Sequence, residues 1–263
     1  MRHSYSTITP SRVRSLAHTA LQQTLCWKPH GRKVTVCRLL DLLLLVATLR
    51  TSLSAVVRRF RFGFSHETAR QAILANLPDQ QRLQQGLLDA LYAVGGRCLR
   101  RRRWDIAIDL HYCPFYGDRH TSGIVGGQKK HGSKYHYAYA TAVIIHRHYR
   151  YTVGLVAVTD RQKPDAIVAA LLAQIEQREL RLRGVAVDSG FDSGETLLLL
   201  QRKELSYVVP LRRKGRGHNR RNACFALPVG TLTEVEWLTE ESRQRVRTQA
   251  VVVRRRKEEA VKV

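Results

Sequence analysis

The sequence predicts an α/β protein in which a helical region precedes a mixed β-sheet. Before Trp104, the apolar positions of residues 34–77 recur at the three- and four-residue spacing of helices. After Trp104, short apolar runs typical of strands alternate with helical stretches, in the order strand, strand, strand, helix, strand, helix, strand. We therefore expect a helical region at 1–103, the sheet at 104–211, and a basic loop with a β-rich insertion at 212–263.

The helical region contains a possible helix-turn-helix at residues 51–74. The stretch "TSLSAVVRRF" places its apolar residues on one helical face, "RFGF" follows as a turn, and Ser65 is suited to cap a second helix. Arg70 and Gln71 would then be exposed on that second helix, where they could reach a groove of DNA. An ordinary helical hairpin explains the same pattern equally well.

Residues 39–49, "LLDLLLLVATL", form the most apolar stretch of the chain. The stretch is too short to span a bilayer, which takes about 20 residues, and Asp41 interrupts it while Arg50 bounds it. We expect a buried helix here and no membrane partner. Another helix is expected at about 81–99, whereas residues 1–30 show only weak periodicity.

The strand order follows from the connections between the predicted strands. The first three strands form an antiparallel meander, and the next helix is a right-handed crossover that lays the fourth strand parallel beside the first. The predicted order is therefore 3-2-1-4-5. The glycine-rich, basic text at 117–134 is expected to be a loop. The strands are expected at 106–110, 135–145, 150–158, 183–188 and 206–211, with helices at 163–180 and 194–205 and further strand-like text at 224–230, 233–238 and 244–253.

The chain carries 45 lysines and arginines against 21 acidic residues, a net charge of +24. An excess of this size needs a counter-charge, and nucleic acid is the first candidate because phosphate contacts release counterions. Acidic lipid surfaces are the second candidate. The basic residues expected to contact a DNA backbone are Arg70, Arg100, Arg101, Arg102, Arg103, Lys129, Lys130, Lys134, Arg212, Arg213, Lys214, Arg216, Arg220 and Arg221.

The five cysteines are widely scattered, and none form a CxxC pair. This spacing fits reduced thiols inside a cell better than a disulfide framework or a zinc site. The N-terminus lacks the charged, apolar and cleavage regions of a signal peptide. A cytoplasmic protein is therefore expected.

Two carboxylates stand out within the predicted sheet. Asp109 interrupts the apolar run "IAIDL", and Asp188 ends the fourth strand. The predicted strand order makes them neighbours, and two buried carboxylates would repel each other unless a cation held them. Mg²⁺ takes such oxygen ligands, which suggests phosphodiester chemistry on a polyanion. The alternatives are that Asp188 belongs to an ordinary turn, that Asp109 pairs with an arginine, and that Asp192 or Ser193 only caps the next helix.

These motifs resemble an insertion-sequence DDE transposase of the four-type group, whose catalytic domain is RNase H-like. The resemblance is carried by "IAIDLHYCPFYG" (106–117), "KKHGSKYHYAYAT" (129–141) and "GVAVDSGF" (184–191), which a helix and "SYVVPL" follow. It implies that Asp109 and Asp188 are catalytic and hold Mg²⁺ or Mn²⁺. One ion would activate water to cut the transposon end, and the freed 3′-hydroxyl would attack target DNA. It also implies double-stranded DNA partners, a homo-oligomer when active, and a place at the prokaryotic nucleoid.

The sequence departs from this family at the third acid. The family carries a glutamate on a later helix, often in a Tyr-x2-Arg-x3-Glu-x6-Lys pattern, and no such pattern occurs before Val263. We therefore expect a truncated transposase that retains the first two acids, with a non-catalytic DNA-binding remnant as the alternative. A further alternative is an RNase H-like nuclease that uses Glu176 or Glu195 in place of the third acid.

Overall fold

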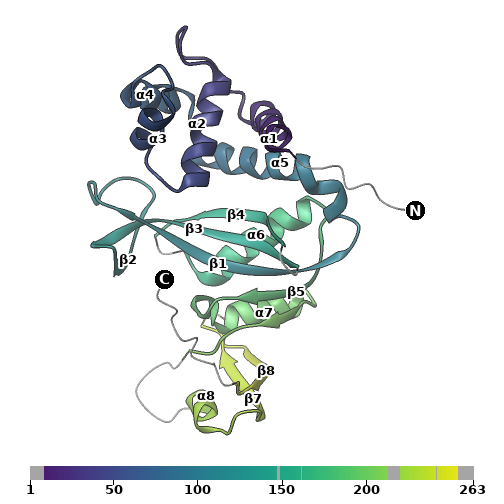
Figure 1. Ribbon diagram of the computed structural model, residues 1–263. Helices are drawn as coiled ribbons and strands as arrows, with labels where there is room; N and C mark the ends of the chain where they lie inside the picture. The colour runs from purple at the N-terminus through teal and green to yellow at the C-terminus, as the bar shows by residue number, and fades with distance from the viewer. Residues whose placement is uncertain (1–8, 147–148, 161, 213–219, 241, 254–263) are drawn as a thin grey trace. The chain divides into compact units, whose positions relative to one another are not determined.

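The computed structural model describes residues 9–146, 149–160, 162–212, 220–240 and 242–253 (Figure 1). The chain forms two compact units. The first consists of Met1–Arg102 with Thr152–Ala157, and the second of Arg103–Tyr151 with Val158–Val263.

The first unit is mainly helical, and each of its described helices begins at a side-chain cap. In every case a hydroxyl or carboxylate oxygen accepts a hydrogen bond from a backbone N–H in the first turn. Such caps satisfy N–H groups that have no carbonyl partner within the helix. The helices, with their capping residues, are α1 (Pro10–Leu25, Thr9), α2 (Val36–Leu49, Thr35), α3 (Leu53–Phe60, Ser52), α4 (His66–Asn76, Ser65) and α5 (Gln80–Leu99, Asp79).

Helix α1 differs from the sequence prediction, which gave only weak periodicity for residues 1–30. Its start has the usual chemistry, because Thr9 caps it and Pro10 occupies its first turn. Its apolar side is narrow: Leu21 and Leu25 are only partly buried, against the cluster that contains Trp27. A narrow apolar stripe gives a weak periodic signal, and tertiary contacts then decide whether the helix forms.

Helix α2 is the buried helix that the apolar stretch predicts. Leu42 packs with Val56 of α3 and with Ala69 of α4, and Leu39 packs with Trp27. The apolar residues of α2 are thus used to hold the other helices of this unit together. Within the described residues, no single helix is long and apolar enough to cross a membrane. Among these residues, only α2 and α3 taken together have the length and composition of a membrane span, and the two helices are bent by 113° relative to each other.

Helices α3 and α4 have the outline of the helix-turn-helix predicted at 51–74. Arg61 follows α3 with a left-handed backbone conformation (φ 49°), and Gly63 in the turn has a φ of 77°. Ser65 then accepts a hydrogen bond from the Thr68 N–H at 3.0 Å, which is the predicted cap. The two helices and the cap are confirmed, while a role in DNA binding stays a prediction.

The second unit is built on a mixed sheet with the strand order β2-β3-β1-β5-β6. β4, whose residues Thr152–Ala157 are grouped with the first unit, pairs with β3. β1 is antiparallel to β3 and parallel to β5, and β6 is parallel to β5. The predicted order 3-2-1-4-5 corresponds to β4-β3-β1-β5-β6 and is confirmed, as is the α/β fold class. The strands are β1 (Arg103–Phe115), β2 (Ile124–Lys130), β3 (Ser133–His146), β4 (Tyr149–Val158), β5 (Arg181–Val187) and β6 (Ser206–Val208).

Strand β2 lies where the sequence predicts a loop, so the loop prediction for 117–134 is wrong in this part. Ile124 pairs with Tyr137, and Gly126 pairs with Tyr135, in an antiparallel arrangement. Two consecutive glycines and a run of polar residues hide this strand from a propensity argument, because the partner strand supplies the order. β1 and β3 are correspondingly longer than predicted, and together with β2 they form a ribbon at one end of the sheet (Figure 1).

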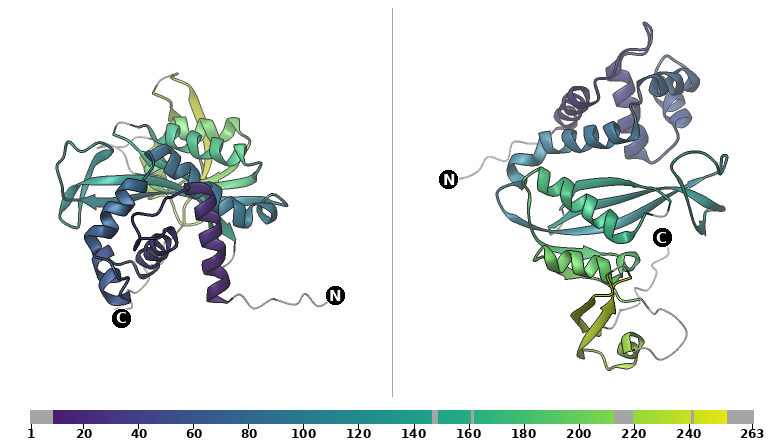
Figure 2. Two further views of the ribbon diagram at one scale, coloured as in Figure 1. Left: turned by 90° about the horizontal axis from the view of Figure 1, so that it is seen from above. Right: turned by 180° about the vertical axis from the view of Figure 1, so that it is seen from behind.

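Helices α6 (Pro164–Gln177) and α7 (Gly194–Arg202) lie on the same face of the sheet (Figure 2). α6 buries an apolar stripe that includes Leu171 and Ile175. In β1, Ile106 and Ile108 are buried, whereas Asp109 points to the opposite face and is exposed. The alternation along β1 therefore separates the core from the face that carries the first acid.

A separate hairpin of β7 (Leu232–Leu238) and β8 (Arg245–Val251) follows the sheet. Its Val235, Trp237 and Val246 form a buried cluster with Leu197 of α7. These two strands agree with the predicted β-rich insertion. The strand predicted at 224–230 is wrong, because the chain there begins with a 3-10 turn (Cys224–Ala226) that follows the short helix α8 (Arg220–Ala223).

Candidate active site

The backbone brings Asp109 and Asp188 together at the end of β5. Ile108 and Val187 are the last paired residues of the parallel strands β1 and β5. Asp109 is the next residue of β1, and Asp188 is the first residue after β5. The Asp188 N–H donates to the Ile108 carbonyl oxygen at 3.3 Å, which extends the pairing by one step. Two acids that lie far apart in the sequence thus occupy neighbouring positions in the sheet, as the crossover argument predicts.

Both carboxylates are held by the backbone that follows them. Asp109 Oδ1 accepts a hydrogen bond from the Leu110 N–H at 2.8 Å, and Asp188 Oδ1 accepts one from the Ser189 N–H at 2.6 Å. Asp188 also opens a 3-10 turn, Ser189–Phe191 (η1). These bonds each use one carboxylate oxygen and restrict the orientation of the other.

The two carboxylates are exposed, and this differs from the buried pair that the sequence predicts. β5 ends at Val187, so β1 from Asp109 onward pairs with β3 alone among the described strands. Because β5 does not extend along this part of β1, the side of β1 away from β3 is open to solvent there. Exposure removes the large desolvation cost that made a buried pair need a cation, so the case for a metal rests on the nearness of the acids.

The donor set is suited to a hard cation such as Mg²⁺ or Mn²⁺, because carboxylate oxygens are the ligands that these ions prefer. Within the described part of the chain, no group of three or more His, Cys, Asp or Glu side chains could hold a metal. The two glutamates considered as a third acid have other partners: Glu176 pairs with Lys203 at 2.5 Å, and Glu195 accepts the Glu240 N–H at 2.5 Å. The hypothesis that either one completes a group of three acids is therefore wrong.

Asp192 has a role in this region that the sequence does not predict. Ser193 caps α7, since its hydroxyl accepts the Thr196 N–H at 3.2 Å. Asp192 is instead buried, with 3% of its surface exposed. Its Oδ1 accepts a hydrogen bond from Trp237 Nε1 at 3.1 Å, and its Oδ2 accepts one from the Arg212 N–H at 2.8 Å. A carboxylate four residues after Asp188 thus connects the η1 turn to the β7–β8 hairpin.

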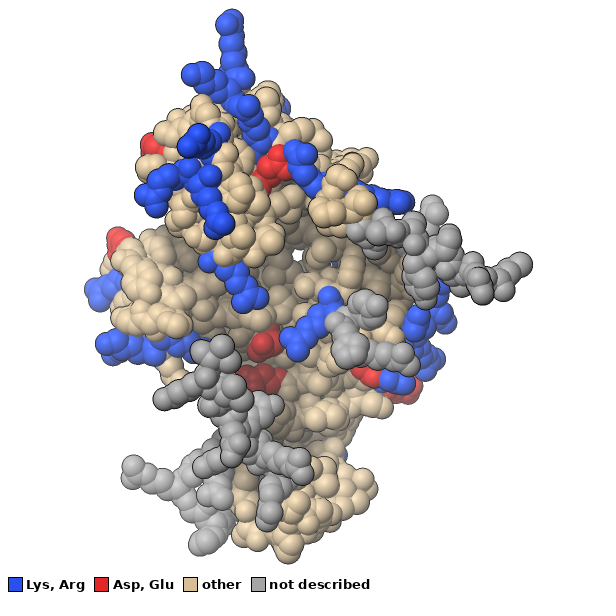
Figure 3. Space-filling model, viewed as in Figure 1, with Lys and Arg blue, Asp and Glu red and all other residues tan. Residues whose placement is uncertain are grey.

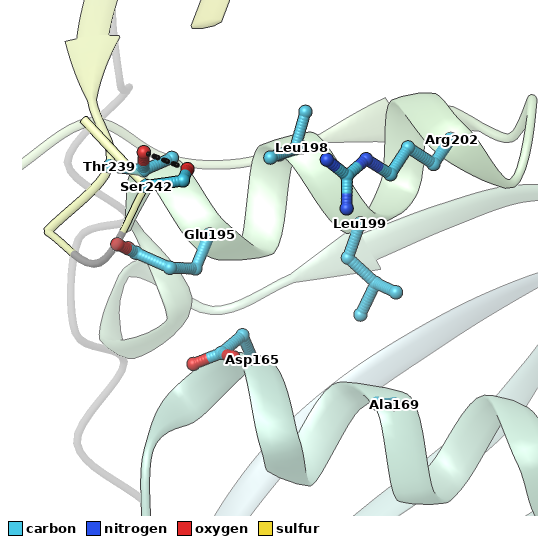
Figure 4. Close-up of a pocket in the computed structure, with 8 residues that line it drawn as sticks. All are labelled: Asp165, Ala169, Glu195, Leu198, Leu199, Arg202, Thr239 and Ser242. Carbon is cyan, nitrogen blue, oxygen red and sulfur yellow. Dashed lines mark hydrogen bonds between the residues drawn. The ribbon is translucent and has the colours of Figure 1, made fainter. Parts of the chain in front are cut away.

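A second acidic group lies in a cavity between α6, α7 and the turn after β7 (Figure 4). The carboxylates of Asp165 and Glu195 lie toward one end of this cavity, beside Thr239 and Ser242, whereas Arg202 lies toward the other. Neither Asp109 nor Asp188 lines it. The remaining lining residues are Ala169, Leu198 and Leu199.

Among the residues predicted to contact DNA, several are exposed but already have partners. Arg70 forms a two-point ion pair with Glu67, at 2.6 Å and 2.9 Å, on the outer side of α4. Arg212 donates through Nε to the Ser189 hydroxyl at 3.0 Å, immediately beside Asp188. Figure 3 shows lysine and arginine side chains spread over the face in view, with few acidic groups among them.

The other predicted DNA contacts fall into three places. Lys129, Lys130 and Lys134 are exposed at the turn between β2 and β3. Arg100 and its three successors join the end of α5 to the start of β1. Arg213, Lys214 and Arg216 lie outside the described residues, and for Arg220 and Arg221 in α8 only the backbone is described.

The comparison with protein families shows the family to which the chain belongs. The model of the transposase DDE domain family matches residues 99–262, which is more than half of the chain. The chain belongs to this family. The matched segment holds both acids, the whole sheet and the β7–β8 hairpin.

Among solved structures, the chain is similar to a piggyBac transposase in a synaptic complex with hairpin DNA. The likeness has a TM-score of 0.43 and 12% sequence identity, and it covers 95% of this chain and 53% of that chain. The chain thus spans about half the length of that relative. No curated protein matches the sequence.

Proposed function

We propose that this protein is a transposase that cuts and joins DNA in a metal-dependent reaction in which Asp109 and Asp188 hold the ion. The single observation that supports this most directly is the register that ends in Ile108–Val187, which makes the two acids neighbours on parallel strands. Neighbouring carboxylates at the carboxyl end of a β-strand are a common place for chemistry in α/β proteins. Membership of the transposase DDE domain family agrees with this assignment.

In this proposal the protein supplies a fixed pair of oxygen ligands. The Leu110 and Ser189 N–H groups each hold one carboxylate oxygen, so that the second oxygen of each acid is available to a cation. A bound Mg²⁺ or Mn²⁺ would supply an activated water and stabilise charge on the phosphate that is attacked. Arg212, held beside Asp188 by the Ser189 hydroxyl, would orient a phosphate of the same strand.

The partner in this proposal is double-stranded DNA, first as transposon end and then as target, with a homo-oligomer as the active form. The net charge of +24 supports a polyanionic partner, because each phosphate contact releases counterions. The exposed lysines of the β2–β3 turn and the arginines at the end of α5 would contact the backbone without reading sequence. Helices α3 and α4 would supply the contacts in a groove.

Calorimetry with Mn²⁺ tests the metal pair directly. We expect one binding event in the wild-type chain and its loss in the double variant Asp109→Asn, Asp188→Asn. The matched control is Asp105→Asn, which removes a carboxylate from the same strand, β1, where it is paired with Arg183. Equal Mn²⁺ binding by all three chains would contradict the assignment of the pair.

Nicking of supercoiled plasmid in Mg²⁺ or Mn²⁺ tests the reaction. We expect nicking by the wild-type chain and by Asp105→Asn, and none by the double variant. If all three chains bind DNA and none nicks it under any of these conditions, the protein acts as a DNA-binding protein and the catalytic proposal is wrong.

A further inference from the structure

The ribbon formed by β1, β2 and β3 ends in two exposed tyrosines. Tyr116, which follows β1, exposes 72% of its surface, and Tyr135, in β3, exposes 38%. Exposing a large aromatic ring forgoes the burial that usually makes it useful to a fold. We call Tyr116 and Tyr135, together with Lys129, Lys130 and Lys134, the tyrosine tip.

Tyr116 is held in place although its ring is open to solvent. Its hydroxyl donates to the His131 carbonyl oxygen at 2.7 Å. His131 and Gly132 form the turn between β2 and β3, with φ values of 48° and 86°. The hydrogen bond therefore attaches the ring to a tight hairpin turn and limits its rotation, while the faces of the ring stay available. A ring ordered in advance loses little entropy when a flat ligand stacks on it.

The tip is strongly basic. Residues 124–139 contain three lysines and neither aspartate nor glutamate, and all three lysines are exposed. Lys130 Nζ lies 5.0 Å from the centroid of the Tyr112 ring, so the hairpin already combines a cation with an aromatic face. Aromatic rings between lysines match a nucleic acid strand, whose bases and phosphates alternate.

Tyr135 of the tip and the first acid lie on one face of the sheet. Phe115 pairs with Tyr135, and Asp109 pairs with Thr141, so these four residues share a face of the β1–β3 ladder. Phe115 lies six positions after Asp109 along β1, a distance of roughly 20 Å at the rise of an antiparallel strand. A few nucleotides of a single strand cover such a distance.

We propose that the tyrosine tip stacks on unpaired bases of the DNA strand that reaches Asp109 and Asp188. The ligand class is single-stranded or frayed DNA, with the rings of Tyr116 and Tyr135 taking bases and the three lysines taking phosphates. This proposal rests on the proposed function for its substrate and adds a binding site to it. Duplex DNA does not suit the site equally, because its bases present no open face to a ring.

The test uses a fluorescein-labelled single strand of 12 thymidines and a 12-base-pair duplex, with anisotropy as the readout. All chains carry Asp109→Asn and are measured in EDTA, so that neither metal binding nor cleavage contributes. Tyr116→Phe and Tyr116→Ala both lose the hydroxyl, and only the second loses the ring. We expect Tyr116→Phe to stay within about twofold of its parent, and Tyr116→Ala to bind the single strand about tenfold more weakly with little change for the duplex.

Photocrosslinking keeps the test independent of any variant. A single strand that carries 5-iodouracil in place of the thymidines should crosslink to Tyr116 or Tyr135 of the parent chain. Mass spectrometry identifies the crosslinked residue. Equal losses for single strand and duplex in Tyr116→Ala, or crosslinks only outside the tip, would overturn the proposal. If the tip binds the single strand as expected but the wild-type chain does not nick plasmid, only the catalytic proposal is contradicted.

Discussion

Trp237 donates a buried hydrogen bond to Asp192, from Nε1 to Oδ1 at 3.1 Å, across 45 positions of the sequence. The two residues expose only 7% and 3% of their surfaces. Asp192 follows Asp188 by four positions, and its other oxygen accepts the Arg212 N–H. One buried carboxylate thus fixes the turn that carries the second acid, the β7–β8 hairpin and the segment after β6.

Replacing Asp192 by asparagine should destabilise the second unit by about 2–3 kcal/mol, measured as the free energy of unfolding in urea. Asparagine keeps one acceptor oxygen, and its amide group would face one of the two donors, Trp237 Nε1 or the Arg212 N–H. Trp237→Phe should cost less, about 1–2 kcal/mol, because the Arg212 bond to Asp192 remains.

Asp118→Asn is the control for Asp192→Asn, since Asp118 is exposed and its side chain accepts the nearby His120 N–H at 2.9 Å. It should change the free energy of unfolding by less than about 0.5 kcal/mol. If Asp192→Asn is as neutral as this control, the buried carboxylate does not hold the hairpin.

Gly194 marks the place where α7 begins against the hairpin. A Cβ atom built on Gly194 would lie 3.3 Å from the Leu238 carbonyl carbon and oxygen and from the Thr239 nitrogen. These are backbone atoms, so they cannot move aside as a flexible side chain would. Gly194→Ala should therefore lower the free energy of unfolding by about 1–3 kcal/mol, measured by urea denaturation.

Gly126→Ala is the matched control for Gly194→Ala. Gly126 is exposed in β2, and a Cβ atom there would meet no other atom within 4 Å. Alanine at this position should be neutral or slightly stabilising, because it reduces the freedom of the unfolded chain. If the two substitutions change the free energy of unfolding equally, the contacts around Gly194 adjust to a Cβ atom without destabilising the fold.

The strand order and the meeting of the two acids could be predicted because both follow from local patterns and one handedness rule. Apolar runs locate β1, β3, β4 and β5, and the right-handed crossover through α6 leaves one place for β5 beside β1. Asp109 and Asp188 become neighbours as soon as that order is accepted. The same reasoning does not predict that the two carboxylates are exposed, because their exposure depends on where β5 ends.

Other features depend on partners that are distant in the sequence. Strand β2 contains "IVGG" and is ordered by its pairing with Tyr135–Tyr137 of β3. Asp192 looks like one of two possible caps for α7, and only the docking of Trp237 shows that it is buried. No local pattern contains these contacts, so propensity and periodicity could not reveal them.

Glu67 should titrate well below an ordinary glutamate. Hydrogen bonds from Arg70, and then from Gln71, lower the pKa of its carboxyl from 4.5 to about 2. Because the pKa is lower in the folded chain, the ion pair contributes its full stability above about pH 4.5 and loses it as the pH falls through about 2. The contribution is small, since both side chains are more than half exposed, at 53% and 52%.

The carboxyl carbon of Glu67, followed by NMR between pH 1.5 and 6, checks this prediction. Arg70→Ala should move the midpoint back up toward 4.5. An unchanged midpoint in that variant, or an ordinary midpoint in the wild-type chain, would show that the ion pair on α4 does not persist in solution, and Arg70 would then be available to a phosphate.

Arg212 should contribute one phosphate contact to duplex binding. Its guanidinium is exposed and held beside Asp188 by the Ser189 hydroxyl, at 3.0 Å. Arg212→Gln should reduce the slope of log affinity against log salt concentration by about 0.9 and weaken binding uniformly across duplex sequences. Anisotropy titrations at several salt concentrations, in EDTA, measure both quantities.

Arg183→Gln provides the comparison for Arg212, because Arg183 lies on neighbouring β5 and is already paired with Asp105. The pairing raises the pKa of Arg183 and lowers that of Asp105, so the couple has no net charge near neutral pH. A phosphate gains little from a cation that a carboxylate neutralises, and the salt slope should stay within about 0.3 of the wild type. A larger change for Arg183 than for Arg212 would place the DNA along β5 rather than beside the η1 turn.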